Sequence, residues 1–401
     1  MKPKNWSRRD FLTTAGVGSI GAMLGPRVAD GAGPNSEKHA RVPTRPFGRT
    51  GIDVSILSLG GMFNIPNNQL MLKQAIRMGV TYWDTAHGYG NGVSETGFGQ
   101  FFKKHPDERR EIFLVTKSPD RSPDGMTRHL DLSLQRMNTD YIDLFFMHAF
   151  RNTRPLTNKV RAWAEKQKAA GRIRLFGFST HRNMEKCLSK AAGLGWIDGI
   201  MMTYNYRLMH KRKMKAAVTA CVEAGIGLTA MKTQGGGQVR SNSEKEMALG
   251  GRFLKKGFTE HQARLKAVWE NPQIAAICSK MPNMTILMAN IAAALDKTRL
   301  SATDLNQLSA VAETTASSYC AGCGDICEDA VSGDIPIADV MRYLMYAESY
   351  QDRERAASRF RRIPEKTRKQ LAWVDYNEAE RWCPQKMAIG HLMRRAERRL
   401  A

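Results

Sequence analysis

The sequence is short of acidic residues. Its 401 residues contain 38 Asp and Glu against 61 Lys and Arg, which gives a formal net charge of +23. Such an excess can indicate nucleic-acid binding. However, the basic residues are scattered, with a mild concentration after Arg353, and no RNA- or DNA-binding motif accompanies them. We therefore expect no nucleic-acid partner, and a positive field that attracts an anionic cofactor, substrate or protein partner.

The sequence also has little that predicts a membrane span. The weakly hydrophobic run at residues 13–24 is too short and too rich in glycine for a spanning helix. It follows Ser7-Arg8-Arg9-Asp10-Phe11-Leu12 and precedes small residues around 29–33, an order that resembles a twin-arginine export signal. The alternative is a chance Arg-Arg pair in a disordered tail. We expect a signal over residues 1–33, a polar linker over 34–46, the twin-arginine machinery as a partner, and a periplasmic or otherwise exported protein.

From Val54 to Leu295 the chain alternates short apolar runs with amphipathic segments. Eight strand–helix pairs in that length predict a (β/α)₈ TIM barrel rather than an open doubly wound sheet. The runs are continuously apolar, as in residues 112–115, which is typical of parallel strands covered on both faces. The predicted strands end at Gly60, Ala86, Lys117, His148, Thr180, Asn205, Lys232 and Met281. The predicted helices cover residues 67–78, 95–104, 126–137, 159–170, 183–192, 211–224, 260–269 and 284–295.

The alternation sets the domain boundaries. We expect an α/β barrel over residues 47–300 and a small, mostly helical, cysteine-containing module over 301–401. In that module helices are predicted at 337–350, 352–361 and 389–399. A long loop with three glycines, Gly235 to Gly237, follows the seventh strand and is expected to run to about residue 257.

Four polar residues stand at or just past the ends of consecutive predicted strands: Asp84, Tyr89, Lys117 and His148. In a TIM barrel these positions converge at the C-terminal mouth, where catalysis occurs. Carbonyl reduction needs a hydride at carbon and a proton at oxygen. Tyrosine can donate that proton, a lysine ammonium can lower its pKa from about 10, a carboxylate can pair with the lysine, and a histidine can orient the substrate oxygen.

The motifs around these residues resemble those of the aldo-keto reductase family over roughly residues 46–298. They are Gly48-Arg49-Thr50-Gly51, Asp84-Thr85-Ala86-x-x-Tyr89-Gly90 with Ser94-Glu95, and Thr139-Asp140-Tyr141-Ile142-Asp143-Leu144 with His148. The resemblance implies a barrel oxidoreductase with Tyr89 as general acid, Lys117 and Asp84 as its pKa partners, and His148 as the group that orients the substrate.

The resemblance also implies NADP(H) or NAD(H), held by residues on the rim of the barrel. Ser179, Tyr204, Asn205 and Asn290 match cofactor-contacting positions of the family. Other positions depart from it: Met201 replaces a glutamine, Met231 the aromatic residue that stacks on nicotinamide, and Ile286 an arginine that grips the NADPH 2′-phosphate. Lys232 or Lys280 could replace that arginine as point charges.

Of the seven cysteines, four form the pattern Cys320-x-x-Cys323-x-x-x-Cys327 with a distant Cys383-Pro384. Four thiolates, one followed by proline, are typical of one [4Fe–4S] site. The pattern resembles a reduced form of the ferredoxin-type tail on some aldo-keto reductase relatives. A Cys₄ zinc site, disulfides and unliganded relic thiols remain alternatives.

The sequence thus predicts an exported enzyme that interconverts a small carbonyl compound, sugar-like among others, and its alcohol. The alternative is an electron-transfer or binding protein on an aldo-keto reductase barrel that no longer uses free NADPH. In that case the cysteine site and a redox partner protein would carry the function.

Overall fold

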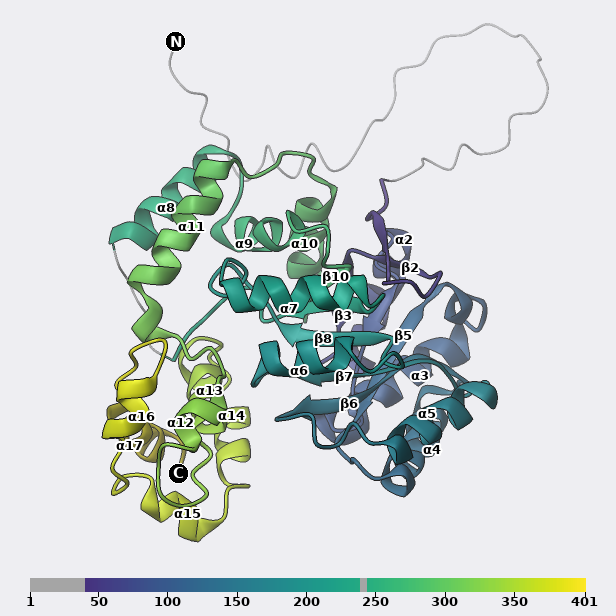
Figure 1. Cartoon of the computed structure of the whole chain (residues 1–401). Coiled ribbons are helices and arrows are strands. Elements are labelled where there is room, and N and C mark those ends of the chain that lie inside the picture. The colour runs from purple at the N-terminus through teal and green to yellow at the C-terminus, as the bar shows by residue number, and fades with distance from the viewer. Residues whose placement is uncertain (1–39, 239–243) are drawn as a thin grey trace, which may run out of the picture. The chain divides into compact units, whose positions relative to one another are not determined.

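Eight parallel strands close into a barrel in the computed structural model, which describes residues 40–238 and 244–401 (Figure 1). The predicted fold class is confirmed. The predicted export signal and residues 34–39 of the predicted linker lie outside the described residues. In order around the barrel the strands are β10 (Ala276–Lys280), β3 (Leu57–Gly60), β4 (Tyr82–Asp84), β5 (Phe113–Ser118), β6 (Ile142–Phe150), β7 (Ile173–Thr180), β8 (Gly199–Thr203) and β9 (Gly227–Met231).

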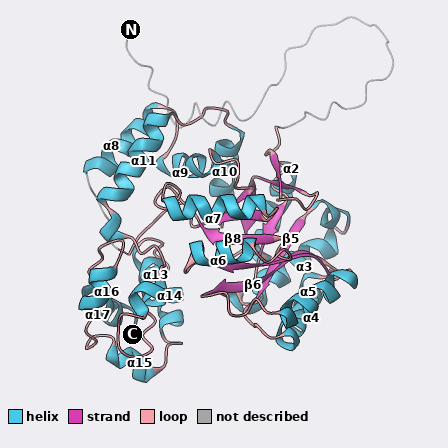
Figure 2. Cartoon of the chain, in the orientation of Figure 1, coloured by secondary structure: helices cyan, strands magenta, loops and turns pink. Residues whose placement is uncertain are grey.

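Helices alternate with the strands and surround them (Figure 2). Buried apolar side chains between the two layers form the largest hydrophobic cluster. This explains the continuously apolar strands, because each strand is covered on both faces. The helices of this layer are α2 (Gln69–Arg77), α3 (Val93–Lys104), α4 (Pro123–Met137), α5 (Asn158–Ala169), α6 (Met184–Ala192), α7 (Arg212–Glu223), α9 (Glu260–Trp269) and α10 (Met284–Leu295). Helix α8 (Glu244–Lys255) lies outside this layer, against α9 and α11.

The predicted strand ends differ from the observed ends by no more than two residues. Two features differ from the prediction. Helix α8 lies in the segment expected to be a long loop, where a run rich in Glu, Lys, Met, Ala and Leu has high helix propensity. Strand β1 (Thr44–Pro46) lies in the predicted linker and pairs with β2 (Asp53–Ser55) as an antiparallel hairpin.

Phe47, directly after β1, fills the N-terminal end of the barrel. Its ring is fully buried and lies 5.4 Å from that of Phe113, centroid to centroid. A Cβ atom on Gly227 would lie 2.4 Å from the Phe47 ring, so only glycine fits there. A second apolar cluster, inside the barrel, is built on this aromatic side chain. It closes the barrel at the end opposite the catalytic residues.

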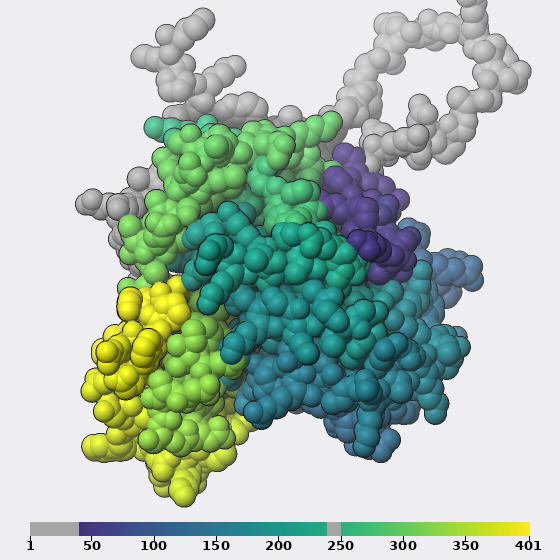
Figure 3. Space-filling view, viewed as in Figure 1, coloured from purple at the N-terminus to yellow at the C-terminus, as the bar shows by residue number. Residues whose placement is uncertain are grey.

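The residues after α10 are helical, as predicted. The last helices have a hydrophobic cluster of their own, drawn from residues 327–400. In Figure 3 their yellow-green surface adjoins the teal surface of the middle of the barrel sequence. These helices are α11 (Ala302–Thr314), α12 (Gly324–Glu328), α13 (Ile337–Glu348), α14 (Arg353–Phe360), α15 (Glu365–Gln370), α16 (Asn377–Trp382) and α17 (Ile389–Leu400).

Within the described ranges, no helix is both long enough and apolar enough to cross a bilayer.

Replacing Phe47 with alanine is expected to lower the free energy of unfolding by about 3–5 kcal/mol, because a large buried ring leaves a cavity between close-packed strands. Urea unfolding followed by circular dichroism measures the change. Leu70→Ala is the control, since Leu70 is 83% exposed and its truncation opens no cavity. Equal midpoints for the two variants would show that the barrel does not depend on Phe47.

Candidate active site

The four predicted catalytic residues converge at the C-terminal ends of three neighbouring strands. Asp84 ends β4, Lys117 lies near the end of β5, and His148 lies near the end of β6. Tyr89 begins a 3₁₀ turn, Tyr89–Gly92, shortly after β4. Adjacent parallel pairing of β4 with β5 and of β5 with β6 brings the side chains together.

Lys117 and Asp84 form an ion pair inside the barrel. Both side chains are at most 3% exposed, and the Lys117 ammonium donates hydrogen bonds to the Asp84 carboxylate and, at 2.6 Å, to the carbonyl oxygen of Thr85. Burial acts to lower the pKa of Lys117, but Asp84 and Tyr89 outweigh it, so the pKa is raised and the ammonium persists. A buried cation is therefore held in place with a carboxylate as its counterion.

The Lys117 ammonium lies 5.2 Å from the centroid of the Tyr89 ring, a cation–π distance. Burial nevertheless raises the pKa of Tyr89 to about 12, against the opposing effect of Lys117. Lys117 acts to lower the pKa of Tyr89, as expected from the sequence, but burial outweighs the ammonium and the net pKa is raised. The phenol is protonated at neutral pH and is ready to act as an acid.

His148 faces Tyr89, with ring centroids 5.8 Å apart and planes at 72°. The β6–β7 register shifts between Met147 and Phe150, and Ala149 has a φ of +56°, so the strand is irregular immediately after the histidine. The Ser179 hydroxyl accepts a 2.9 Å hydrogen bond from the Ala149 amide. Irregularities of this kind often aim a side chain at an active site.

Burial, reinforced by the charges of Lys117 and Arg359, lowers the pKa of His148 well below its ordinary value. The imidazole is therefore neutral at physiological pH. A neutral imidazole can donate a hydrogen bond to a substrate oxygen without competing with Tyr89 as the proton source.

Tyr89 and His148 open onto a cavity of about 270 Å³. Its walls come from the strand ends, from the loop after β9 and from the segment that begins α14. Asp84 also lines it, whereas Lys117 lies behind Asp84 and Tyr89. The other lining residues are Gly60, Met62, His181, Met201, Met231, Lys232, Thr233, Gln234, Cys278, Ser279, Lys280, Tyr350, Asp352 and Arg355.

The residues predicted to contact a nicotinamide cofactor fall into two groups. Lys232 and Lys280 line the cavity, but Ser179, Tyr204, Asn205 and Asn290 do not. The Tyr204 hydroxyl accepts a hydrogen bond from Asn271, and the Asn205 amide donates to the Lys232 carbonyl and to the Tyr319 hydroxyl. Asn290 donates to Ser279, which itself lines the cavity. These four side chains do not face the cavity, and their hydrogen bonds stabilise the segments around it.

The glycine run after β9 is packed against the end of the chain. A Cβ on Gly237 would lie 2.2 Å from the Ser318 carbonyl oxygen, and one on Gly236 would lie 2.9 Å from the Ser349 Cβ. The Ser349 hydroxyl donates to the Gly237 carbonyl. The glycines thus permit the close approach that brings Tyr350 to the cavity.

Several lining residues were not among the predicted site residues. Cys278 lies on the cavity wall beside Asp84. Tyr350, Asp352 and Arg355 belong to the C-terminal helices, which the sequence did not connect with the mouth of the barrel. The only sequence signal for Arg355 is the concentration of basic residues after Arg353.

Cys320, Cys323, Cys327 and Cys383 line one apolar cavity of about 20 Å³, and all four are free thiols. That volume is close to the space for a single water molecule. Among the described residues, no three His, Cys, Asp or Glu side chains are arranged to hold a metal ion. The thiols do converge on one cavity, and the arrangement of the described residues adds no support for an iron–sulfur cluster.

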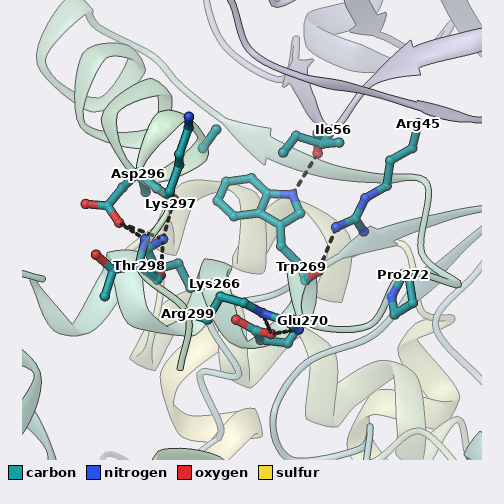
Figure 4. A pocket seen from close by; sticks show the side chains of 12 residues that line it. Arg45, Ile56, Lys266, Trp269, Glu270, Pro272, Asp296, Lys297, Thr298 and Arg299 are labelled. Carbon is teal, nitrogen blue, oxygen red and sulfur yellow. Dashed lines mark hydrogen bonds and ion pairs between the residues drawn. The ribbon is translucent and has the colours of Figure 1, made fainter. Parts of the chain in front are cut away.

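A larger cavity, of about 400 Å³, lies at the N-terminal ends of the strands (Figure 4). Two of its basic groups have internal partners: Arg45 donates to the Trp269 carbonyl at 2.7 Å, and Lys266 pairs with Asp296 at 3.2 Å. The Trp269 indole donates to the Ile56 carbonyl. Such contacts hold α9 and α10 against the bottom of the barrel, the face associated with stability rather than catalysis.

The barrel, with an ion-paired lysine beside a tyrosine and a histidine at its C-terminal mouth, defines a class of (β/α)₈ proteins built for acid–base chemistry. The chain belongs to the aldo/keto reductase family, whose model matches residues 57–319.

Among curated relatives, "Aldo-keto reductase yakc [NADP(+)]" of Schizosaccharomyces pombe is 30% identical over 49% of this chain and 62% of its own length. "Uncharacterized oxidoreductase YrpG" of Bacillus subtilis is 27% identical over 55% of this chain and 74% of its own. The chain thus spans less than two thirds of the length of the fission-yeast relative.

Among solved structures, the holo form of aldo-keto reductase AKR11C1 from Bacillus halodurans matches with a TM-score of 0.56 at 22% identity, over 68% of this chain and 96% of its own. The thermostable aldo-keto reductase Tm1743 matches with a TM-score of 0.57 at 24% identity, over 67% of this chain and 99% of its own. These likenesses agree with the observed barrel.

The residues after 319 lie outside the family match and are tied to the barrel by buried ion pairs. Arg182, just after β7, is buried and pairs with Glu328 of α12 and, at 3.3 Å, with Asp339 of α13. Arg151, after β6, reaches the same Asp339 at 2.6 Å. The helices that complete the cavity are therefore held by charges from the barrel loops.

Arg182→Met is expected to destabilise this junction by about 3 kcal/mol, because removing one member of a buried pair leaves carboxylates without their partner. Limited proteolysis should then cleave the C-terminal helices faster. The control is Lys186→Met, which removes a 74% exposed lysine paired with Asp325 and should cost at most about 1 kcal/mol. Unchanged proteolysis of the Arg182 variant would contradict the role given to this contact.

Proposed function

We propose that the protein is an oxidoreductase that interconverts a carbonyl and an alcohol, with Tyr89 as general acid and base. The observation that carries the proposal is the convergence of the Asp84–Lys117 ion pair, the protonated Tyr89 phenol and the neutral His148 imidazole at one cavity. The family membership supports the same chemistry.

The roles follow from the geometry. Tyr89 donates its proton to the substrate oxygen as negative charge develops there, and the adjacent Lys117 ammonium stabilises the phenolate that remains. Asp84 keeps the ammonium fixed and charged. His148 donates a hydrogen bond to the same oxygen and orients the carbonyl carbon. In the direction of alcohol oxidation, the phenolate takes the proton back.

A nicotinamide dinucleotide, NADP(H) or NAD(H), would supply or accept the hydride. Lys280 is exposed at the rim of the cavity and is the candidate point charge for a nucleotide phosphate. Met201 and Met231 provide an apolar wall. The cavity is slightly smaller than the roughly 300–1,000 Å³ of a drug-sized site, which favours a small carbonyl compound, sugar-like compounds among them.

The alternative function, electron transfer through the cysteines, has no observation in its favour among the described residues. No step of the proposed reaction is routed through them.

Tyr89→Phe is expected to lower kcat for carbonyl reduction by roughly 10²–10⁴-fold, the usual contribution of a general acid. Steady-state rates with NADPH and a panel of small aldehydes measure the loss, and circular dichroism checks the fold. Tyr141→Phe serves as the control, because Tyr141 lies at the start of β6, far along the strand from His148. Unchanged turnover by Tyr89→Phe would end the assignment.

The pH profile gives an independent check of Tyr89. Its pKa is raised to about 12, so the acid form exists throughout the neutral range and the reduction rate should fall only as the pH nears that value. The reverse oxidation needs phenolate and should accelerate over the same rise in pH. A reduction rate that already falls near pH 7 would mean that a group other than Tyr89 donates the proton.

We also propose that the twin-arginine route exports the protein to the periplasm, because of the Ser7-Arg8-Arg9-Asp10-Phe11-Leu12 motif and the run that follows it.

Replacing Arg8 and Arg9 by lysine is expected to keep the protein in the cytoplasm, because the export receptor reads the guanidinium pair and not charge alone. Cell fractionation of a bacterium that has the pathway measures the distribution. Lys4→Arg, outside the pair, should leave export unchanged. Export that persists in the double lysine variant would refute the proposal.

A further inference from the structure

The cavity that contains Tyr89 and His148 has one wall from outside the barrel. Tyr350, Asp352 and Arg355, at the start of α14 and just before it, line the cavity together with the catalytic residues. Arg355 is close enough to influence the titration of both Tyr89 and His148. The C-terminal helices therefore contribute a positive charge to the space that the substrate must occupy.

Two cations in this wall are held by aromatic rings rather than by carboxylates. The Lys232 ammonium lies 4.9 Å from the ring centroids of both Tyr346 and Tyr350. The Arg355 guanidinium lies 4.1 Å from the centroid of Tyr346. Cation–π contacts position a charge without neutralising it.

The charges that line the cavity do not balance. Its cations are Lys232, Lys280 and Arg355, and in the described part of the chain no carboxylate lies within ion-pair distance of any of them. The two lining carboxylates are engaged elsewhere: Asp84 with Lys117, and Asp352 as the N-cap of α14, accepting from the Arg355 amide. An anion inside the cavity would therefore meet a net positive charge, from three cations and one remaining carboxylate, Asp352.

We propose that this wall binds a carboxylate or phosphate group of the substrate, with Lys232 and Arg355 as its ligands, so that the substrate is an acidic aldehyde or ketone. Its carbonyl faces Tyr89 and His148, while its acid group lies against Tyr346 of α13 and Tyr350 just after that helix. The inference rests on the proposed function. To that function the inference adds the class of substrate. The acid group only binds, and no bond is made or broken there.

The electrostatics agree with this geometry. Burial lowers the pKa of Lys232 to about 8, and the nearby Arg355 and Arg342 push in the same direction while Tyr346 opposes them. An anion beside Lys232 would restore its charge and offset that effect. A nucleotide phosphate has the same chemistry. However, Lys232 and Arg355 lie among the tyrosine rings, in a cavity that also contains the catalytic pair, whereas Lys280 lies at the exposed rim.

The test compares succinic semialdehyde with its methyl ester, a neutral aldehyde of nearly the same shape, using the full chain and NADPH. Arg355→Gln is expected to raise KM for the acid at least tenfold relative to KM for the ester, and any change in kcat should be the same for both aldehydes. Arg355→Lys should recover part of the loss. Arg353→Gln, on the same helix and exposed, is the matched control and should change nothing.

Two kinetic outcomes would overturn the proposal. One is an equal loss for acid and ester, which would mean that Arg355 has only a structural role. The other is a raised KM for NADPH with an unchanged acid-to-ester ratio, which would assign the anion to the nucleotide.

Calorimetric titration with succinate, which cannot be reduced, tests the anion site apart from catalysis. If neither aldehyde is turned over, the proposed function fails on its own. Succinate binding that weakens in Arg355→Gln would still support the site, and an absence of binding to the unsubstituted chain would refute it.

Discussion

The ion pair between Lys117 and Asp84 is the constraint around which the mouth of the barrel is organised. An ammonium buried to this degree is tolerated only beside a counterion and carbonyl acceptors. Those come from the adjacent strand β4, as Asp84, and from Thr85 just after it. The pair therefore requires β4 and β5 to be neighbours in exact register. The same register places Tyr89 next to the ammonium, so the chemistry depends on the pairing of the strands.

Burial has opposite consequences for the two residues that face the substrate. It keeps the Tyr89 phenol protonated and the His148 imidazole neutral, so the pair contains one acid and one uncharged hydrogen-bond donor. In an exposed site the histidine would titrate near neutrality and compete for the proton. The dry environment thus divides the roles between two side chains less than 6 Å apart, centroid to centroid.

The sequence predicted the barrel and the convergence of the four residues because both follow from local pattern: apolar runs of strand length, and polar residues where those runs stop. It could not predict the net pKa of Tyr89, since that depends on total burial. Nor did it indicate that Gly236 and Gly237 pack against Ser349 and Ser318, because close approach between distant segments leaves no periodic signal. Arg355 was missed for the same reason: its place at the cavity comes from ion pairs made by Arg182, more than 140 residues earlier.

The wall supplied by Tyr350 and Arg355 gives the molecule a form of thermodynamic linkage. A ligand that touches both the barrel and α14 contacts two parts of one compact unit that are far apart in the sequence. If packing of the C-terminal helices raises the affinity for a ligand, the bound ligand stabilises the packed helices by the same free energy. Because these helices follow the barrel strands in the chain, the cavity takes its final form only after they have been synthesised and have packed against the barrel.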